Sequence, residues 1–93
     1  MRAKRTDANQ EAIVKTLRKM GCSVFITSMV GGGFPDAVVG YRGKNYLFEI
    51  KDGSKSKSAQ RLTNHENLFH LTWRGHVAVI TSIQDAIDIV SKL

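Results

Sequence analysis

Two acidic residues and a lysine in short apolar segments have the side-chain types that could bind a metal ion. Asp36 precedes one apolar segment, and Glu49 and Lys51 follow another. Side chains alternate between the two faces of a strand, so Glu49 and Lys51 are expected to point to the same side. A carboxylate in an apolar setting needs a partner. Mg²⁺ suits this role because it binds carboxylates, water and the phosphate of a substrate.

A short hairpin would bring these residues together. The dipeptide Arg42-Gly43 predicts a two-residue turn between the two apolar segments. Counting back from that turn along both strands pairs Asp36 with Glu49. A four-residue turn would pair Asp36 with Lys51 instead, and in either register the three side chains share one face of the sheet. A three-residue turn or a bulge would break this arrangement.

This set of residues points to phosphoryl chemistry. A cation at Asp36 and Glu49 would polarise a phosphate and lower the pKa of a bound water. Lys51 could position or activate that water, or stabilise negative charge in the transition state. The plain alternative is that Asp36 only begins a strand and that Glu49 and Lys51 form a surface pair on an edge strand.

The elements around these residues predict an α/β domain over residues 7–93, preceded by a basic arm at residues 1–6. The expected elements are a helix from Asp7 that ends at Gly21, strands at 23–28, 36–41 and 44–51, a helix at about 63–73, a strand at 76–81 and a helix capped by Ser82. This order, α-β-β-β-α-β-α, predicts a mixed sheet flanked by helices. Residues 53–60 are expected to form a mobile loop.

Composition narrows the choice of partner. The 93 residues carry a formal net charge of +6, which favours a polyanion such as nucleic acid. The single cysteine, Cys22, is expected to be a packed or half-exposed thiol and excludes an intrachain disulfide, in agreement with a cytoplasmic setting. No apolar segment approaches the ~18 residues of a membrane span, so we expect no membrane partner.

Further residues could contribute to binding or packing. Lys55, Lys57 and Arg61 follow the Glu49 strand and are expected to contact a DNA backbone, although a solvated loop is the ordinary alternative. Lys4 and Arg5 of the basic arm are weaker candidates for the same role. The triple glycine at 31–33 predicts a loop that approaches the site closely. Leu62, Phe69 and Trp73 are expected on the buried side of the second long helix, with Trp73 serving as a core residue or a dimer anchor.

The motifs resemble a known family in combination. Pro35-Asp36 followed by Glu49-Ile50-Lys51 resembles the PD-(D/E)xK nuclease motif, and the wider sequence resembles the VRR-NUC family from about Asp7 to about Val90. The segments that carry this resemblance are Gly33-Phe34-Pro35-Asp36, Val39-Gly40-Tyr41-Arg42-Gly43, Glu49-Ile50-Lys51-Asp52-Gly53, Leu62-Thr63 and Trp73-Arg74-Gly75. The resemblance implies a restriction-endonuclease-like core, dependence on Mg²⁺ or Mn²⁺ and phosphodiester hydrolysis in DNA. Small members of phage or bacterial origin resemble enzymes that cut four-way (Holliday) junctions as homodimers.

The resemblance also implies roles for individual residues. Asp36, Glu49 and the backbone carbonyl of Ile50 would bind the metal, and Lys51 would be the catalytic lysine. An auxiliary residue from the first helix would be Gln10, with Glu11 as the alternative.

The sequence also allows other interpretations of the first helix and of the function. Gln10 could instead complete a capping box with Asp7. Residues 76–82 lack the arginines after which the family is named, so no role is carried over for them. A nuclease that acts on flaps or other DNA structures and a non-catalytic DNA-binding module on the same fold are the alternative functions.

Overall fold

The computed structural model, which describes residues 8–92, contains both helices and strands. The elements are α1 (Ala8–Lys19), β1 (Ser23–Ile26), β2 (Ala37–Tyr41), β3 (Lys44–Ile50), α2 (Lys57–Gln60), α3 (Asn64–Thr72), β4 (Val77–Ile80) and α4 (Ile83–Val90). The expected order is confirmed, with the short helix α2 in addition. The basic arm with Lys4 and Arg5, and the expected cap Asp7, lie outside the described residues.

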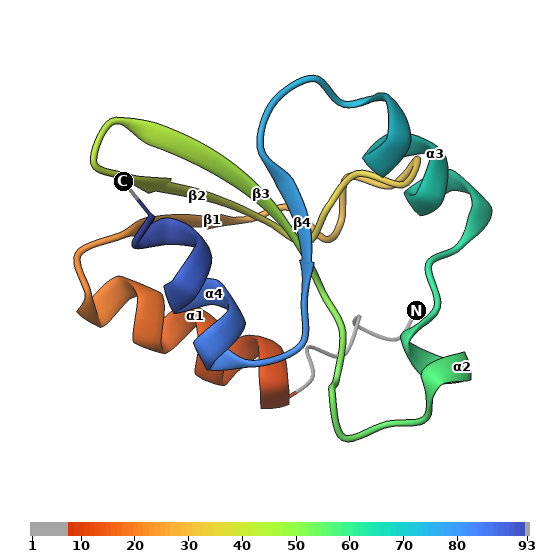
Figure 1. The fold of residues 1–93 in the computed structure, drawn as a ribbon, viewed down its shortest axis with the longest axis horizontal. Helices are drawn as coiled ribbons and strands as arrows, with labels where there is room; N and C mark the ends of the chain where they lie inside the picture. The colour runs from red at the N-terminus through yellow and green to blue at the C-terminus, as the bar shows by residue number, and fades with distance from the viewer. Residues whose placement is uncertain (1–7, 93) are drawn as a thin grey trace.

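The four strands form one mixed sheet in the order β1-β2-β3-β4. The first three strands pair antiparallel, whereas β3 and β4 run parallel. Helices α1 and α4 lie together against one face of this sheet (Figure 1). Helix α3 lies past the end of the sheet that is opposite the β2–β3 turn. Strand β3, which carries Glu49, therefore has a hydrogen-bonded neighbour on each side.

The hairpin between β2 and β3 has the two-residue turn that the sequence predicts. Arg42 and Gly43 both have positive φ angles, 52° and 79°, as a type I′ turn requires. Tyr41 therefore pairs with Lys44, and the register continues without a bulge to the end of β2. Asp36 lies directly before the last pair of this register, Ala37 with Phe48, and its own N–H donates to the Phe48 carbonyl.

The hydrophobic core lies between the sheet and the two helices on its face. Ile13 and Leu17 of α1 meet Ala86 and Val90 of α4 above the inward side chains of the sheet, which include Phe48. Their spacing along each helix places them on one side, so both helices can bury an apolar stripe. Cys22 is buried in this cluster, as expected.

Two local expectations are wrong. The segment expected as a loop at 53–60 contains α2, which begins after Ser56 because the Ser56 hydroxyl accepts a hydrogen bond from Ala59. Trp73 is not in the core, since 45% of its surface is exposed. It ends α3 and stacks on Phe69 with 5.1 Å between ring centroids, so one side of the indole faces solvent.

Within residues 8–92, every helix is too short or too polar to span a bilayer.

Candidate active site

Asp36 is fixed at the point where the β1–β2 loop enters the hairpin. Its backbone N–H donates to the carbonyl of Phe48 at 2.9 Å, and its carbonyl accepts from Thr27 at 2.8 Å. Its side-chain Oδ2 accepts a 2.7 Å hydrogen bond from the backbone N–H of Ile50. Backbone and side chain are both held, so the carboxylate has a defined position beside β3.

Glu49 is a buried carboxylate opposite Asp36. Only 3% of its surface is exposed, and its Oε1 is buried without a hydrogen-bond donor among the described residues. Burial, and next the neighbouring Asp36 carboxylate, raise the pKa of Glu49 to about 8. The site without metal therefore favours a proton on Glu49 at neutral pH, and it has a buried oxygen available for a ligand.

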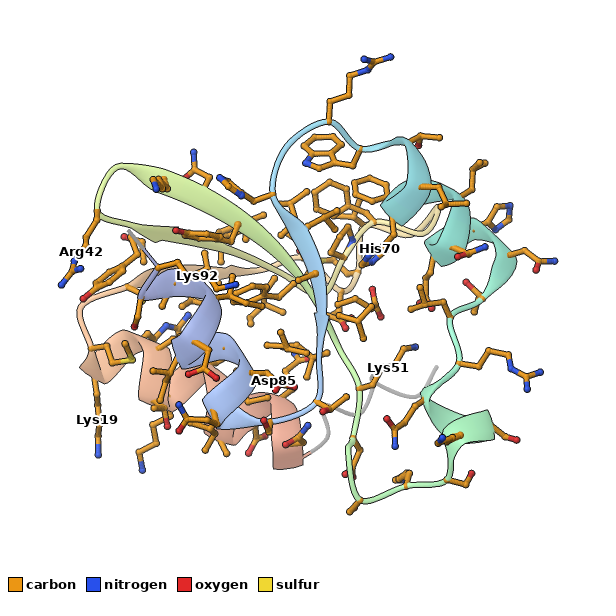
Figure 2. All side chains as sticks on the ribbon, in the orientation of Figure 1. Lys19, Arg42, Lys51, His70, Asp85 and Lys92 are labelled. Atoms are coloured by element: carbon orange, nitrogen blue, oxygen red, sulfur yellow. The ribbon has the colours of Figure 1, made fainter. Side chains whose placement is uncertain are left out.

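Lys51 extends from the end of β3 beside this pair of carboxylates. Its Nζ lies 3.6 Å from Oε2 of Glu49 and 3.2 Å from Oε1 of Glu66. Figure 2 shows Lys51 pointing away from the sheet toward the segment that leads into α3. The structure thus brings Asp36, Glu49 and Lys51 together, as the hairpin register predicts.

Glu66 is a third carboxylate at this site, and sequence reasoning missed it. Thr63 caps α3 by accepting from the Glu66 N–H at 3.1 Å, while Oε1 of Glu66 accepts from the Thr63 N–H at 2.9 Å. Burial opposes its ionisation, but the hydrogen bond from Thr63 and the ion pair with Lys51 prevail and lower the pKa of Glu66. The capping-box spacing in the sequence predicts the local bond, but no sequence signal predicts the contact with Lys51.

Asn9, in the first turn of α1, is a second contact that the sequence did not indicate. Its side-chain amide donates to the carbonyl of Lys51 at 2.8 Å and to the carbonyl of Thr81 at 3.4 Å. The start of α1 therefore joins the ends of β3 and β4 next to the site.

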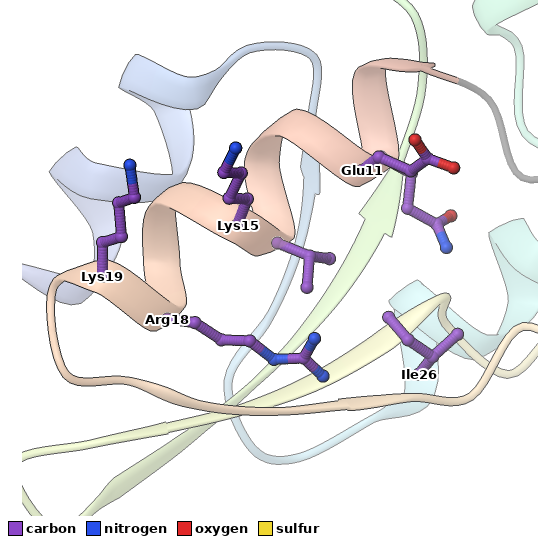
Figure 3. Close-up of a pocket in the computed structure, with 7 residues that line it drawn as sticks. Glu11, Lys15, Arg18, Lys19 and Ile26 are labelled. Atoms are coloured by element: carbon purple, nitrogen blue, oxygen red, sulfur yellow. The ribbon is translucent and has the colours of Figure 1, made fainter.

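The two auxiliary candidates from the first helix lie elsewhere on α1. Gln10 is buried and Glu11 is exposed, and both line a pocket between α1 and β1 (Figure 3). Arg18 crosses toward β1 there and donates to the carbonyl of Val24 at 2.9 Å. Asp36, Glu49 and Lys51 do not line this pocket. A role for Gln10 or Glu11 in catalysis stays a prediction.

The glycine loop approaches the site closely, as expected. Gly33 has a φ of +84°, and a Cβ at this position would overlap the carbonyl of His65 and lie 2.9 Å from the backbone nitrogen of Glu66. The next residue, Phe34, packs its ring edge-on against Phe69 at 5.3 Å. The loop that precedes Asp36 and the helix α3 that contains Glu66 are therefore in direct contact.

The basic candidates that follow β3 lie at the surface. Lys55, Lys57 and Arg61 are exposed, so they are accessible to a polyanion. Asp52 stabilises the start of their segment, since its Oδ1 accepts from both the backbone and the hydroxyl of Ser54. Their contact with DNA stays a prediction.

One histidine is close to the site. His70 lies one helical turn after Glu66, and its Nε2 is buried without a hydrogen-bond partner among residues 8–92. Burial lowers the pKa of His70, so the ring is neutral at pH 7.

The donor set fits a metal ion that keeps part of its water shell. Across residues 8–92, no three side chains of His, Cys, Asp or Glu form a complete metal site. The orphaned Oε1 of Glu49 and the neighbouring Asp36 carboxylate are the two groups that would hold such an ion. The Ile50 N–H faces Asp36, and in regular strand geometry the carbonyl of the same residue is expected at the same edge. Mg²⁺ is ordinarily held by one or two carboxylates plus water and phosphate.

These observations define a small α/β domain with two facing carboxylates and a lysine at the end of a β-hairpin. A comparison of the chain with protein-family models, curated proteins and solved structures gives no match. The similarity to the VRR-NUC family therefore rests on the sequence motifs alone.

Proposed function

We propose that this chain is a Mg²⁺- or Mn²⁺-dependent endodeoxyribonuclease that hydrolyses phosphodiester bonds. The observation that carries the proposal is the buried Glu49 carboxylate, which faces Asp36 and lies beside Lys51. Two carboxylates opposite each other destabilise a hairpin unless something compensates their charge. A divalent cation would compensate this charge once Glu49 is ionised, and perturbed carboxylates of this kind are typical of catalytic sites.

Each residue has a role in this reaction that follows from its position. A divalent cation at the site would supply charge compensation for the scissile phosphate and a water of lowered pKa. Asp36 is held by Ile50 through one oxygen and offers the other as a ligand. Glu49 offers its orphaned Oε1. Lys51 keeps its ammonium group next to Glu49, where it can orient the attacking water or stabilise charge on the phosphate.

The substrate in this proposal is branched DNA, with the four-way junction first, and the active form is a homodimer. The motifs support this substrate through their resemblance to junction-resolving nucleases, and the net charge of +6 supports a polyanion. A junction requires two coordinated cuts, which a symmetric dimer can make with two sites. Leu68, Leu71 and Trp73 of the α3 region are exposed apolar residues available for such a contact.

The test is cleavage of labelled four-way junction, flap and linear duplex with Mg²⁺, Mn²⁺ or chelator. We expect metal-dependent cleavage, strongest on the junction, that is lost in Asp36→Asn, Glu49→Gln and Lys51→Ala. Lys44→Ala is the matched control, because Lys44 is an exposed lysine at the other end of the same strand. Its cleavage should equal that of the wild type.

Three results would count against the proposal. A folded wild-type protein that cuts none of these substrates refutes the enzyme. DNA binding that needs no metal and is unchanged in Lys51→Ala, without cleavage, indicates a binding module. A monomeric mass in solution with junction bound refutes the dimer.

A further inference from the structure

The lysine of the site has an anchor outside the hairpin that carries the two facing carboxylates. Lys51 Nζ is closer to Glu66, at 3.2 Å, than to Glu49, at 3.6 Å. We propose that Glu66 is a positioning residue that keeps the Lys51 ammonium group in place when Glu49 binds a metal ion. The inference rests on the proposed nuclease function and extends it to α3.

Glu49 alone is a poor anchor for Lys51 in the state that would react. A carboxylate that binds a divalent cation has its negative charge compensated, so its attraction for an ammonium group falls. The cation also repels that ammonium group directly, because like charges a few ångströms apart interact strongly in a partly buried site. Glu66 lies on another element and is the other negatively charged partner of Lys51 among the described residues.

Glu66 is held in position by contacts that do not depend on Lys51. Its Oε1 accepts from the Thr63 N–H, and its own N–H donates to the Thr63 hydroxyl, which completes the capping box. Gly33 packs against the backbone of the same turn. The carboxylate is therefore fixed before Lys51 reaches it, so the lysine alone loses conformational freedom on pairing.

Glu66 could instead serve only as a helix cap, and the chain offers variants that separate the two roles. Thr63→Ala removes the hydroxyl acceptor but leaves both the backbone donor and the Lys51–Glu66 pair. Glu66→Gln keeps an oxygen acceptor for Thr63 and Lys51 but removes the negative charge. Glu66→Ala removes both contacts.

The first measurement is the rate of junction cleavage at saturating Mn²⁺. Glu66→Ala should lower kcat by about tenfold to a hundredfold, the size expected when a reacting group is misplaced by about 1 Å. KM for the junction should change by less than about twofold, because Glu66 does not touch the DNA backbone in this proposal. Glu66→Gln should recover part of the loss, and Thr63→Ala should keep the wild-type kcat.

The second measurement does not need catalysis. The rate at which a small amine-acylating reagent modifies Lys51, followed by peptide mass spectrometry with Mg²⁺ present, reports how firmly the ammonium group is held. Lys44, exposed on the same strand, is the internal reference. Glu66→Ala should raise the relative reactivity of Lys51 about twofold to fivefold, the range for loss of a partly exposed ion pair. Thr63→Ala should leave it unchanged.

The outcomes distinguish this inference from the function on which it rests. Equal losses of kcat in Thr63→Ala and Glu66→Ala would show that Glu66 acts only as a helix cap. Unchanged acylation of Lys51 in Glu66→Ala would also overturn the positioning role. If the wild type cuts no DNA, the nuclease proposal fails, and the acylation rates still decide whether Glu66 holds Lys51. If Glu66→Ala does not fold, the same comparison is made with Glu66→Gln, for which unchanged Lys51 reactivity overturns the inference.

Discussion

The backbone N–H of Ile50 donates a hydrogen bond to Oδ2 of Asp36, with 2.7 Å between the two heavy atoms. This side-chain bond adds one more hydrogen bond between the two strands, just beyond the last residue pair of β2 and β3. This bond occupies one oxygen of the carboxylate and sets the direction of the other. Asp36 thus contributes to the hairpin and to the candidate metal site at the same time.

Asp36→Asn should separate these two contributions. The amide oxygen of asparagine can still accept from Ile50, while the negative charge that opposes ionisation of Glu49 disappears. In chelator, we expect the free energy of unfolding in urea to stay the same or rise by about 1 kcal/mol. Asp36→Ala loses the acceptor and should instead lose about 1–3 kcal/mol. Equal destabilisation by both substitutions would contradict this account of the charge.

Stability should depend on pH through Glu49 in a direction opposite to that of ordinary carboxylates. Its pKa rises from 4.5 in the unfolded chain to about 8 in the folded protein, so the folded state binds this proton more tightly. The stabilisation is complete below about pH 4.5 and is lost as pH rises toward 8. Without metal, we expect the free energy of unfolding to fall on the order of 3 kcal/mol across this window.

The control for this prediction is Glu49→Gln, which resembles the protonated side chain and should lack the decline. The difference between the two proteins isolates Glu49, because burial lowers the pKa of His70, which therefore changes stability with pH in the opposite sense in both proteins. Added Mg²⁺ should stabilise the wild type more at pH 8 than at pH 6, since the metal competes with the proton. A wild-type decline equal to that of Glu49→Gln would exclude a buried, protonated Glu49.

Gly33→Ala should disturb the site through backbone contact, and Gly31→Ala is its matched control. Both glycines have positive φ angles, +84° and +81°, so both substitutions cost about 1–2 kcal/mol of backbone strain. Only at Gly33 does the new Cβ meet the backbone of α3, at His65 and Glu66. We expect Gly33→Ala to lower the melting temperature further and to lower cleavage more than Gly31→Ala. Equal effects at the two positions would show that the loop–helix contact is unimportant.

The exposed cations that follow β3 should determine the salt dependence of DNA binding. Replacing Lys55, Lys57 and Arg61 together by alanine should reduce the slope of log affinity against log salt concentration by about 2 to 3, close to one per phosphate contact. The measurement is a series of junction titrations by fluorescence anisotropy with catalytically inactive Asp36→Asn protein.

The control for this triple variant removes three exposed lysines elsewhere: Lys15, Lys19 and Lys44. Lys19 ends α1, whereas the start of α1 contacts Lys51, and Figure 2 shows Lys19 and Lys51 far apart. This variant has the same loss of net charge, so an equal reduction of the slope would refute a specific role for the segment after β3.

The sequence predicts the central hairpin well because one local feature determines it. A two-residue turn allows a single register, and the alternation of side chains then places Glu49 and Lys51 on the face of Asp36. The helices that end at glycines or begin at capping residues are predicted for the same reason. In each case, residues a few positions apart in the sequence determine the local structure.

The contacts of Glu66 and Asn9 depend on the path of the chain and could not be predicted in this way. Fifteen residues separate Glu66 from Lys51, and 42 separate Asn9 from Lys51. The geometry of these pairs follows from how α3 and α1 pack, which no local pattern encodes. Trp73 is a related case, since its apolar character predicts burial, whereas its place at the end of α3 leaves it half exposed.

The hydrogen bonds from Asn9 give Lys51 a backbone that is tethered on two sides. Its N–H donates to Ile80 of β4, and its carbonyl accepts from the first turn of α1. The exposed segment with Lys55 and Lys57 begins only after this tether. A displacement of that segment is therefore resisted at Lys51 by one hydrogen bond to β4 and one from α1 before it reaches Glu49.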